Sequence, residues 1–181
     1  MSVWRTARSL DDLGRLMARW LEGGIPSWPG YEGPFGYEER DARHLVAPLA
    51  AVNRGGFLTT VSQPGDDAQA DDGARWRQRA FVCGYVRAHS GLLARLPALE
   101  REGLTVLVGR PARPVALTDR DRMPTLAVPA WRPGRDHLAH IWAGTGRRAL
   151  RDLRRGVPVC VLDPVWGRDD RLWPALALLR P

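Results

Sequence analysis

Two amides, a hydroxyl and a guanidinium flank two strands that we predict to be consecutive in the chain. Ser62 and Gln63 end the first strand, and Gln78 and Arg79 precede the second. In an antiparallel pair, the end of one strand lies beside the start of the next, so these four side chains would meet. Such a cluster suits a polar planar group or an anion. The alternative is that Gln63 caps a turn while Gln78 and Arg79 are solvated.

Two further charged residues follow predicted strands. Arg110 comes after the apolar run 104–108, and Asp163 comes after the run 157–162. In open parallel sheets, ligands bind beyond the carboxyl ends of the strands. We therefore predict a site for a small polar or nucleotide-like ligand, with transferase or hydrolase chemistry as one outcome and no cofactor identified. Its predicted residues are Ser62, Gln63, Gln78, Arg79, Arg110 and Asp163.

The elements that would position this site follow a pattern that occurs three times. A helix ends at a glycine and is followed at once by an apolar strand, at Gly56, Gly103 and Gly156. Helix, glycine cap and buried strand are typical of an α/β layer. The sequence thus predicts a single α/β domain over residues 1–181, a mixed, mainly parallel sheet and helices on both faces. The predicted central strands are 57–61, 80–86, 104–108 and 157–162.

Several other segments frame this core. The weaker runs 115–117 and 125–128 predict edge strands or a hairpin, because proline and charged residues bracket both. The connection from Gln63 to Arg77 is predicted to be a loop, and its length is typical of functional or mobile loops. A passage rich in proline, glycine and aromatic residues, 25–40, contains Trp28, Tyr31, Phe35 and Tyr37, which either cover a pocket or lie over the sheet. A second passage, 129–146, is rich in proline, glycine and tryptophan.

The chain is basic through arginine alone. It carries 27 Lys and Arg residues, none of them lysine, and a formal net charge of +7. Arginine codons are GC-rich, so part of this charge is explained by genome composition. The alternative function is a binding module without catalysis, in which Arg147, Arg151 and Arg154 on one helix contact nucleic acid or an acidic protein. The other interpretation of that helix is an ordinary solvated face.

Two further residue sets have a weaker chemical interpretation. His137 and His140, with Asp136, have a metal-ligand spacing, but no cysteine or second carboxylate cluster accompanies them, and we predict no metal site. Cys83 and Cys160 lie in predicted buried strands and are interpreted as small core residues, not as a disulfide. The polar start of the chain and the absence of an apolar run of about 18 residues predict a cytoplasmic protein without a membrane span.

The chain resembles an uncharacterised family of small proteins common in high-GC actinobacteria. The segments that carry the resemblance are WRTARSLDDLGRLMARWLEGGIPSWPGY, GFLTTVSQPG, WRQRAFVCGYV and LWPAL. The resemblance spans most of the chain and is weakest from about residue 110 to 145. It implies a cytoplasmic bacterial origin and no particular activity. The family pattern draws attention to Thr59, Thr60, Ser62, Gln63, Pro64, Gly65, Gln78 and Arg79 and gives none of them a role. Thr60 is also among our predicted ligand-binding residues.

Overall fold

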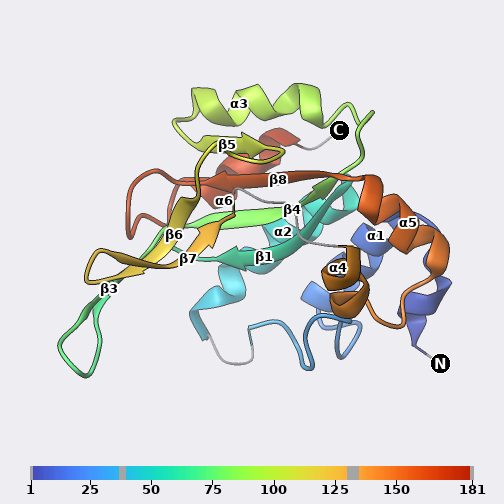
Figure 1. Cartoon of the computed structure of the whole chain (residues 1–181), viewed down its shortest axis with the longest axis horizontal. Helices are drawn as coiled ribbons and strands as arrows, with labels where there is room; N and C mark the ends of the chain where they lie inside the picture. The colour runs from blue at the N-terminus through green and yellow to red at the C-terminus, as the bar shows by residue number, and fades with distance from the viewer. Residues whose placement is uncertain (1, 37–39, 130–134, 180–181) are drawn as a thin grey trace.

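The computed structural model describes residues 2–36, 40–129 and 135–179. Two four-stranded sheets and a set of helices make up the fold (Figure 1). The helices are α1 (Leu10–Leu21), α2 (Val46–Arg54), α3 (Leu96–Arg101), α4 (Arg135–Ile141), α5 (Arg147–Arg155) and α6 (Leu172–Ala175). Short 3-10 turns are η1 (Val3–Thr6), η2 (Arg40–Leu45), η3 (Leu93–Arg95) and η4 (Leu176–Leu179). The strands are β1 (Phe57–Gln63), β2 (Asp66–Gln69), β3 (Arg75–Gln78), β4 (Phe81–Val86), β5 (Thr105–Val108), β6 (Val115–Arg120), β7 (Met123–Val128) and β8 (Val157–Leu162).

The central sheet has the strand order β1-β4-β8-β5, and every neighbouring pair is antiparallel. Its four strands lie where the apolar runs predict strands. Phe81 of β4 pairs with Gln63 of β1 on one side and with Leu162 of β8 on the other. The two middle strands, β4 and β8, are therefore hydrogen-bonded along both edges and form the centre of the sheet.

The predicted mainly parallel sheet is wrong, and the strand order explains why. Strands β4 and β5 run in the same direction and are joined through α3, as in a parallel crossover, but β8 lies between them. Likewise β1 and β8 run in the same direction with β4 between them. Helix-glycine-strand units fix the direction of a strand after its helix, but they do not determine which strand becomes its neighbour. The alternation of directions makes every ladder antiparallel.

One face of the central sheet is covered by helices. Apolar residues of α1, α2, α3, α5 and α6 form a single buried cluster with Phe57, Val82 and Val161 of the sheet. Within it, the fully buried Asn53 of α2 joins the helix to β1: its Nδ2 donates to the Thr59 hydroxyl at 2.7 Å, and its Oδ1 accepts from the Thr59 N–H at 3.1 Å. Gly14 of α1 allows the close approach of α2, because a Cβ there would lie 2.4 Å from the Asn53 carbonyl oxygen.

Part of the opposite face of the central sheet is covered by the second sheet, so the prediction that helices cover both faces is also corrected; α4 lies over another part of this face. This sheet has the order β2-β3-β6-β7, again antiparallel throughout. The predicted hairpin at 115–128 is present as β6 and β7, and its turn residues Asp121 and Arg122 have φ values of 50° and 68°. The long connection that we predicted to be a loop forms the hairpin β2–β3, where Arg75 pairs with Asp67 across the strands.

The second sheet is too small to cover the whole of this outer face. A compact apolar cluster of Phe81, Leu117, Cys160 and Leu162 marks where the two sheets meet. The remainder of the face continues towards α4 and the aromatic segment around Trp28. In the described residues, no helix has both the length and the apolar character needed to cross a bilayer.

Candidate ligand cavity

A cavity of about 500 Å³ lies over the outer face of the central sheet. Its floor is made by alternate residues of the two middle strands, because side chains i and i+2 of a strand point to the same face. From β4 these are Phe81, Cys83 and Tyr85, and from β8 they are Pro158 and Cys160. The floor is therefore almost entirely apolar. It is formed by the two strands that have hydrogen-bonded neighbours on both sides.

The walls of the cavity come from segments that are distant in the sequence. Leu117 of β6 and Leu126 and Val128 of β7 form one side. A second side of the cavity is formed in part by Trp28 and Trp142, whose ring centroids lie 5.1 Å apart. Leu138 of α4 lines the cavity beside them. Trp142 also meets Trp4 edge to face at 6.1 Å, and Trp4 Nε1 donates to the Ser27 carbonyl at 3.0 Å. These contacts fix the aromatic side of the cavity to the N-terminal segment.

Polar groups lie where the cavity meets solvent. Arg110, after β5, and His137, on α4, both line the cavity and are exposed. Thr60 of β1 also lines it, and its hydroxyl donates to the Cys83 carbonyl at 3.3 Å. Val61 and Leu126, which also contribute to the lining, are among the exposed large apolar residues of the protein. The arrangement can enclose an apolar body and offer a cation to one anionic end.

The two cysteines lie in the floor of this cavity and are joined by a disulfide. Cys83 and Cys160 are directly opposite each other in the β4–β8 ladder, with a Cα–Cα distance of 4.0 Å. Our interpretation of them as unpaired core residues is therefore wrong. The sequence placed each cysteine in a buried strand, but only the strand order brings these two strands together.

Four of the predicted site residues lie together at one end of the central sheet. Gln63 ends β1, Arg79 lies just before β4, and Asp163 follows β8, whose last residue pairs with Phe81. The Asp163 N–H donates to the Ala80 carbonyl at 2.9 Å, which fixes this corner. Gln78 joins it through its Nε2, which donates to the Pro64 carbonyl at 2.8 Å. The predicted meeting of the β1 end and the β4 start is thus present in the geometry.

Two members of this group already have internal partners. Asp163 is fully buried, and its carboxylate accepts hydrogen bonds from Arg168 Nε at 2.7 Å, Arg168 Nη2 at 2.8 Å and the Val165 N–H at 2.8 Å. The same contact with Asp163 raises the pKa of Arg168. The amide of Gln78 is similarly occupied by the Pro64 carbonyl. Asp163 and Gln78 therefore hold the chain in place at this corner.

The guanidinium of Arg79 still has a hydrogen-bond donor available. Its guanidinium lies 4.3 Å above the Trp166 ring, and Arg77 approaches the same ring at 4.9 Å. Burial lowers the pKa of Arg79, while the nearby charges of Asp119 and Asp163 oppose that shift. Within the described part of the chain, Arg79 Nε and Gln63 Oε1 are buried atoms without a hydrogen-bond partner.

Arg110, Thr60 and Ser62 are placed away from this corner. Strand β5 runs opposite to β8, so its end, Val108, pairs with Val159, and Arg110 follows at the other end of the sheet. Arg110 and Thr60 instead meet at the apolar cavity. Ser62 lines a smaller hollow of about 310 Å³ on the far side of β1, beside Trp20 and Phe35.

A comparison with known families matches nearly the whole chain, residues 1–179. The chain belongs to the family described as a domain of unknown function, DUF6919. No curated protein matches it. The match supports the resemblance to an uncharacterised family, while the actinobacterial origin stays a prediction. The site of this DUF6919 protein must therefore be argued from its own geometry.

The remaining metal candidate is on α4 of the DUF6919 fold. His137 and His140 are both exposed, and the side chain of Asp136 is outside the described residues. Among the side chains that the structure describes, no group of three or more His, Cys, Asp or Glu residues is arranged to hold a metal ion.

The cavity residues that sequence reasoning missed are mostly apolar. Tyr85, Leu117, Leu126 and Trp142 carry no chemical signal of their own, and all four belong to segments assigned only as strands or as an aromatic passage. The available signal was the unbroken apolar character of residues 80–86 and 157–162, which requires cover on both faces. The aromatic passage 25–40, which we predicted either to cover a pocket or to lie over the sheet, contributes Trp28 to the cavity lining. Trp142, from the second passage, also lines the cavity.

The geometry at the junction of the two sheets yields a stability prediction. Asp119 of β6 has a side chain that is only 4% exposed and accepts hydrogen bonds from Arg77 Nε at 3.0 Å and Nη2 at 2.6 Å. Arg77→Ala leaves that carboxylate buried without its cation, so we expect the free energy of unfolding to fall by about 3 kcal/mol in urea denaturation.

Arg75→Ala is the matched control for this prediction. Arg75 lies two residues away on the same strand and pairs with the more exposed Asp67. Its removal should leave the denaturation midpoint essentially unchanged, because exposed ion pairs contribute little. Equal losses in the two variants would contradict a structural role for the Arg77–Asp119 pair.

Proposed function

We propose that this DUF6919 protein binds a small organic molecule with an apolar, ring-sized body and one anionic end. The observation that carries the proposal is the apolar cavity of about 500 Å³ with Arg110 at its opening. Its volume falls in the range of about 300–1,000 Å³ that is usual for small-molecule sites. Its composition is also usual for such sites: apolar and aromatic walls with a few polar groups that orient the ligand.

The apolar part of the ligand would be bound by the hydrophobic effect. Phe81, Leu117 and Trp142 are buried and line the cavity, so a ring that enters exchanges water contacts for close packing. Each Å² of apolar surface removed from water contributes roughly 25 cal/mol. A two-ring molecule therefore gains enough from burial alone for measurable affinity, after the cost of immobilising it is subtracted.

The charged part of the ligand would be recognised by Arg110. Among the described residues of the lining, Arg110 is the one with a guanidinium, which can donate two parallel hydrogen bonds to a carboxylate, sulfonate or phosphate. His137 and the Thr60 hydroxyl lie at the same cavity and are further candidates for hydrogen bonds to the ligand. Two of the seven residues predicted from sequence, Thr60 and Arg110, thus support a ligand site in this new position.

The cavity is better support for binding than for a reaction. A polar or nucleotide-like ligand at the strand ends has less support, because Gln78 and Asp163 are engaged by other parts of the chain. Transferase or hydrolase chemistry stays a prediction. Of the lining residues that the structure describes, His137 alone carries an imidazole, and the two cysteines are bonded to each other.

Removing Arg110 should separate the charged and apolar parts of recognition. We expect the wild type to bind both 2-naphthalenesulfonate and the uncharged 2-naphthol in isothermal titration calorimetry. Arg110→Ala should weaken binding of the sulfonate about tenfold, since a hydrogen bond to a charged group contributes roughly 1.5 kcal/mol or more. It should leave the affinity for 2-naphthol nearly unchanged.

Arg113→Ala is the control, because Arg113 is exposed and is not part of the cavity lining. An unchanged sulfonate affinity in Arg110→Ala, or an equal loss in Arg113→Ala, would count against this role.

Filling the cavity should block both probes. Val128 lines the cavity from β7 on the same face as Leu126, and Val128→Phe adds a ring to that space. We expect at least a tenfold loss of affinity for both naphthalenes, with little change in the melting temperature because β7 is an edge strand. Met123→Phe, on the same strand but exposed and away from the cavity, should bind as the wild type does. Retained binding in Val128→Phe would place the probes elsewhere on the protein.

A further inference from the structure

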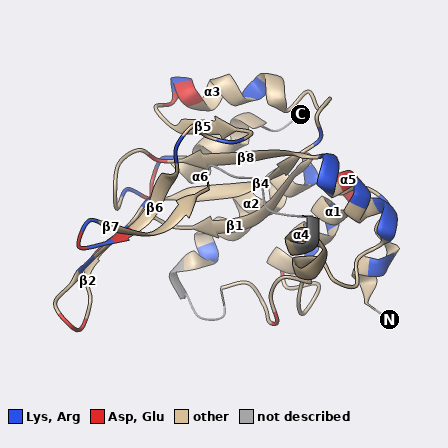
Figure 2. Ribbon diagram, in the orientation of Figure 1, with Lys and Arg blue, Asp and Glu red and all other residues tan. Residues whose placement is uncertain are grey.

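The solvent face of α5 carries a concentrated positive charge. The side chains of Arg147, Arg148, Arg151 and Arg155 are all exposed. At about 100° per residue, these four positions fall within an arc of roughly 100° on the helix surface. Ala149 and Leu153, on the opposite side, are fully buried against the core. Much of the α5 ribbon is blue in Figure 2, which marks its arginine residues.

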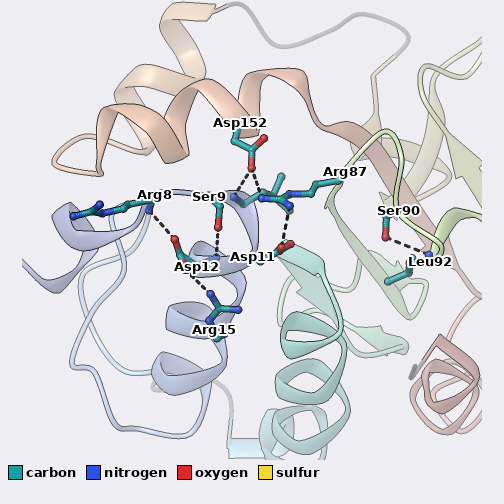
Figure 3. Close-up of polar contacts among 10 residues, drawn as sticks. Arg8, Ser9, Asp11, Asp12, Arg15, Arg87, Ser90, Leu92 and Asp152 are labelled. Atoms are coloured by element: carbon teal, nitrogen blue, oxygen red, sulfur yellow. Dashed lines mark hydrogen bonds and ion pairs between the residues drawn. The ribbon is translucent and has the colours of Figure 1, made fainter.

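These four arginines have no hydrogen bond or ion pair with any residue that the structure describes. The one acidic residue of the helix, Asp152, is directed elsewhere: its carboxylate accepts from the Leu10 N–H at 2.8 Å and from Arg87 at 3.0 Å (Figure 3). Arg154 differs from the four, because it is half-buried and has an interaction within the protein. The positive face therefore consists of Arg147, Arg148, Arg151 and Arg155.

A polar groove of about 820 Å³ adjoins the carboxyl end of α5 and includes Arg155 in its lining. The other arginines of the groove form ion pairs. Arg87 contacts both Asp11 and Asp152, and Arg15 contacts Asp12 (Figure 3). Arg54 contacts Glu22. These pairs are close to neutral. The groove thus extends the polar surface, while the unpaired charge stays on α5.

This face lacks the apolar centre of a protein-protein interface. The exposed large apolar residues of the described chain are Tyr31, Val61, Val108, Met123, Leu126, Val165 and Leu178, and none lies on α5 or in the adjoining groove. Protein interfaces usually have an apolar or aromatic core, whereas surfaces that bind nucleic acid are more polar and strongly positive. The chemistry of the face therefore favours a phosphate backbone over an acidic protein.

We propose that the face formed by Arg147, Arg148, Arg151 and Arg155 binds the phosphate backbone of a nucleic acid duplex without reading its sequence. From Arg147 to Arg155 the helix rises roughly 12 Å, and a strand of duplex DNA carries a phosphate every 3.4 Å or so along its axis. The face thus spans about three to four phosphates of one strand. The high arginine content of the whole chain does not explain this arrangement, because the four unpaired charges are gathered on one face of one short helix.

The test is the salt dependence of binding to a short fluorescent DNA duplex of mixed sequence, followed by polarisation between about 50 and 200 mM salt. Four phosphate contacts predict a slope of log K against log salt of about −3.6. The triple variant Arg147→Glu, Arg151→Glu and Arg155→Glu should bind at least tenfold more weakly at the lowest salt, with an unchanged circular dichroism spectrum. A duplex of a different sequence should bind the wild type within about twofold, since no base contact is involved.

The control is the triple variant Arg101→Glu, Arg113→Glu and Arg122→Glu, which makes the same change in net charge at exposed positions elsewhere. It should bind the duplex within about threefold of the wild type. Equal losses in the two triple variants would overturn the proposal, because net charge alone would then explain binding. Absence of binding by the wild type at the lowest salt would also overturn it. So would tighter binding of polyglutamate than of the duplex at the same salt, which would assign the face to an acidic protein.

Discussion

The requirement to cover both faces of strands β4 and β8 determines much of this structure. These strands are apolar along their whole length and have neighbours on both sides, so neither face can be left to solvent. Helices cover one face completely. The other face is shared among a small antiparallel sheet, α4 and the aromatic residues Trp28 and Trp142. Because these three coverings do not meet over the middle of the face, an apolar cavity is left between them.

The polar corner at the ends of β1 and β8 holds the second sheet in the position that creates this cavity. The Arg79 N–H donates to the Leu117 carbonyl at 3.0 Å, and the Gly167 N–H donates to the Gln78 carbonyl at 3.0 Å. Arg77 and Arg79 both stack on Trp166, and Arg77 also neutralises the buried Asp119. The residues first predicted to bind a ligand thus largely connect the two sheets. Their contribution to the cavity is indirect, through the placement of β6 and β7.

The sequence was informative about local structure and much less so about pairing. Apolar runs located all four central strands, and proline and charged residues around 115–128 indicated the β6–β7 hairpin, because both features depend on neighbouring residues. Strand order depends on contacts between distant segments. A helix-glycine-strand unit is compatible with either a parallel or an antiparallel strand beside it in the sheet. Because of this ambiguity, we predicted Arg110 at the wrong end of the sheet and did not predict the disulfide between Cys83 and Cys160. The cavity was concealed for the same reason, since residues from separate strands, α4 and the Trp28 segment meet only after the sheets have formed.

The most direct test of the central claim is to locate a bound ring by methyl NMR. The protein would be labelled at its leucine and valine methyl groups and saturated with 2-naphthalenesulfonate. Binding in the cavity predicts intermolecular nuclear Overhauser effects to Leu117, Leu126 and Val128, and none to Leu49 and Leu99, which are buried beneath the opposite face of the sheet. Contacts to a different set of methyl groups, or none at saturation, would contradict the assignment of this cavity as the ligand site.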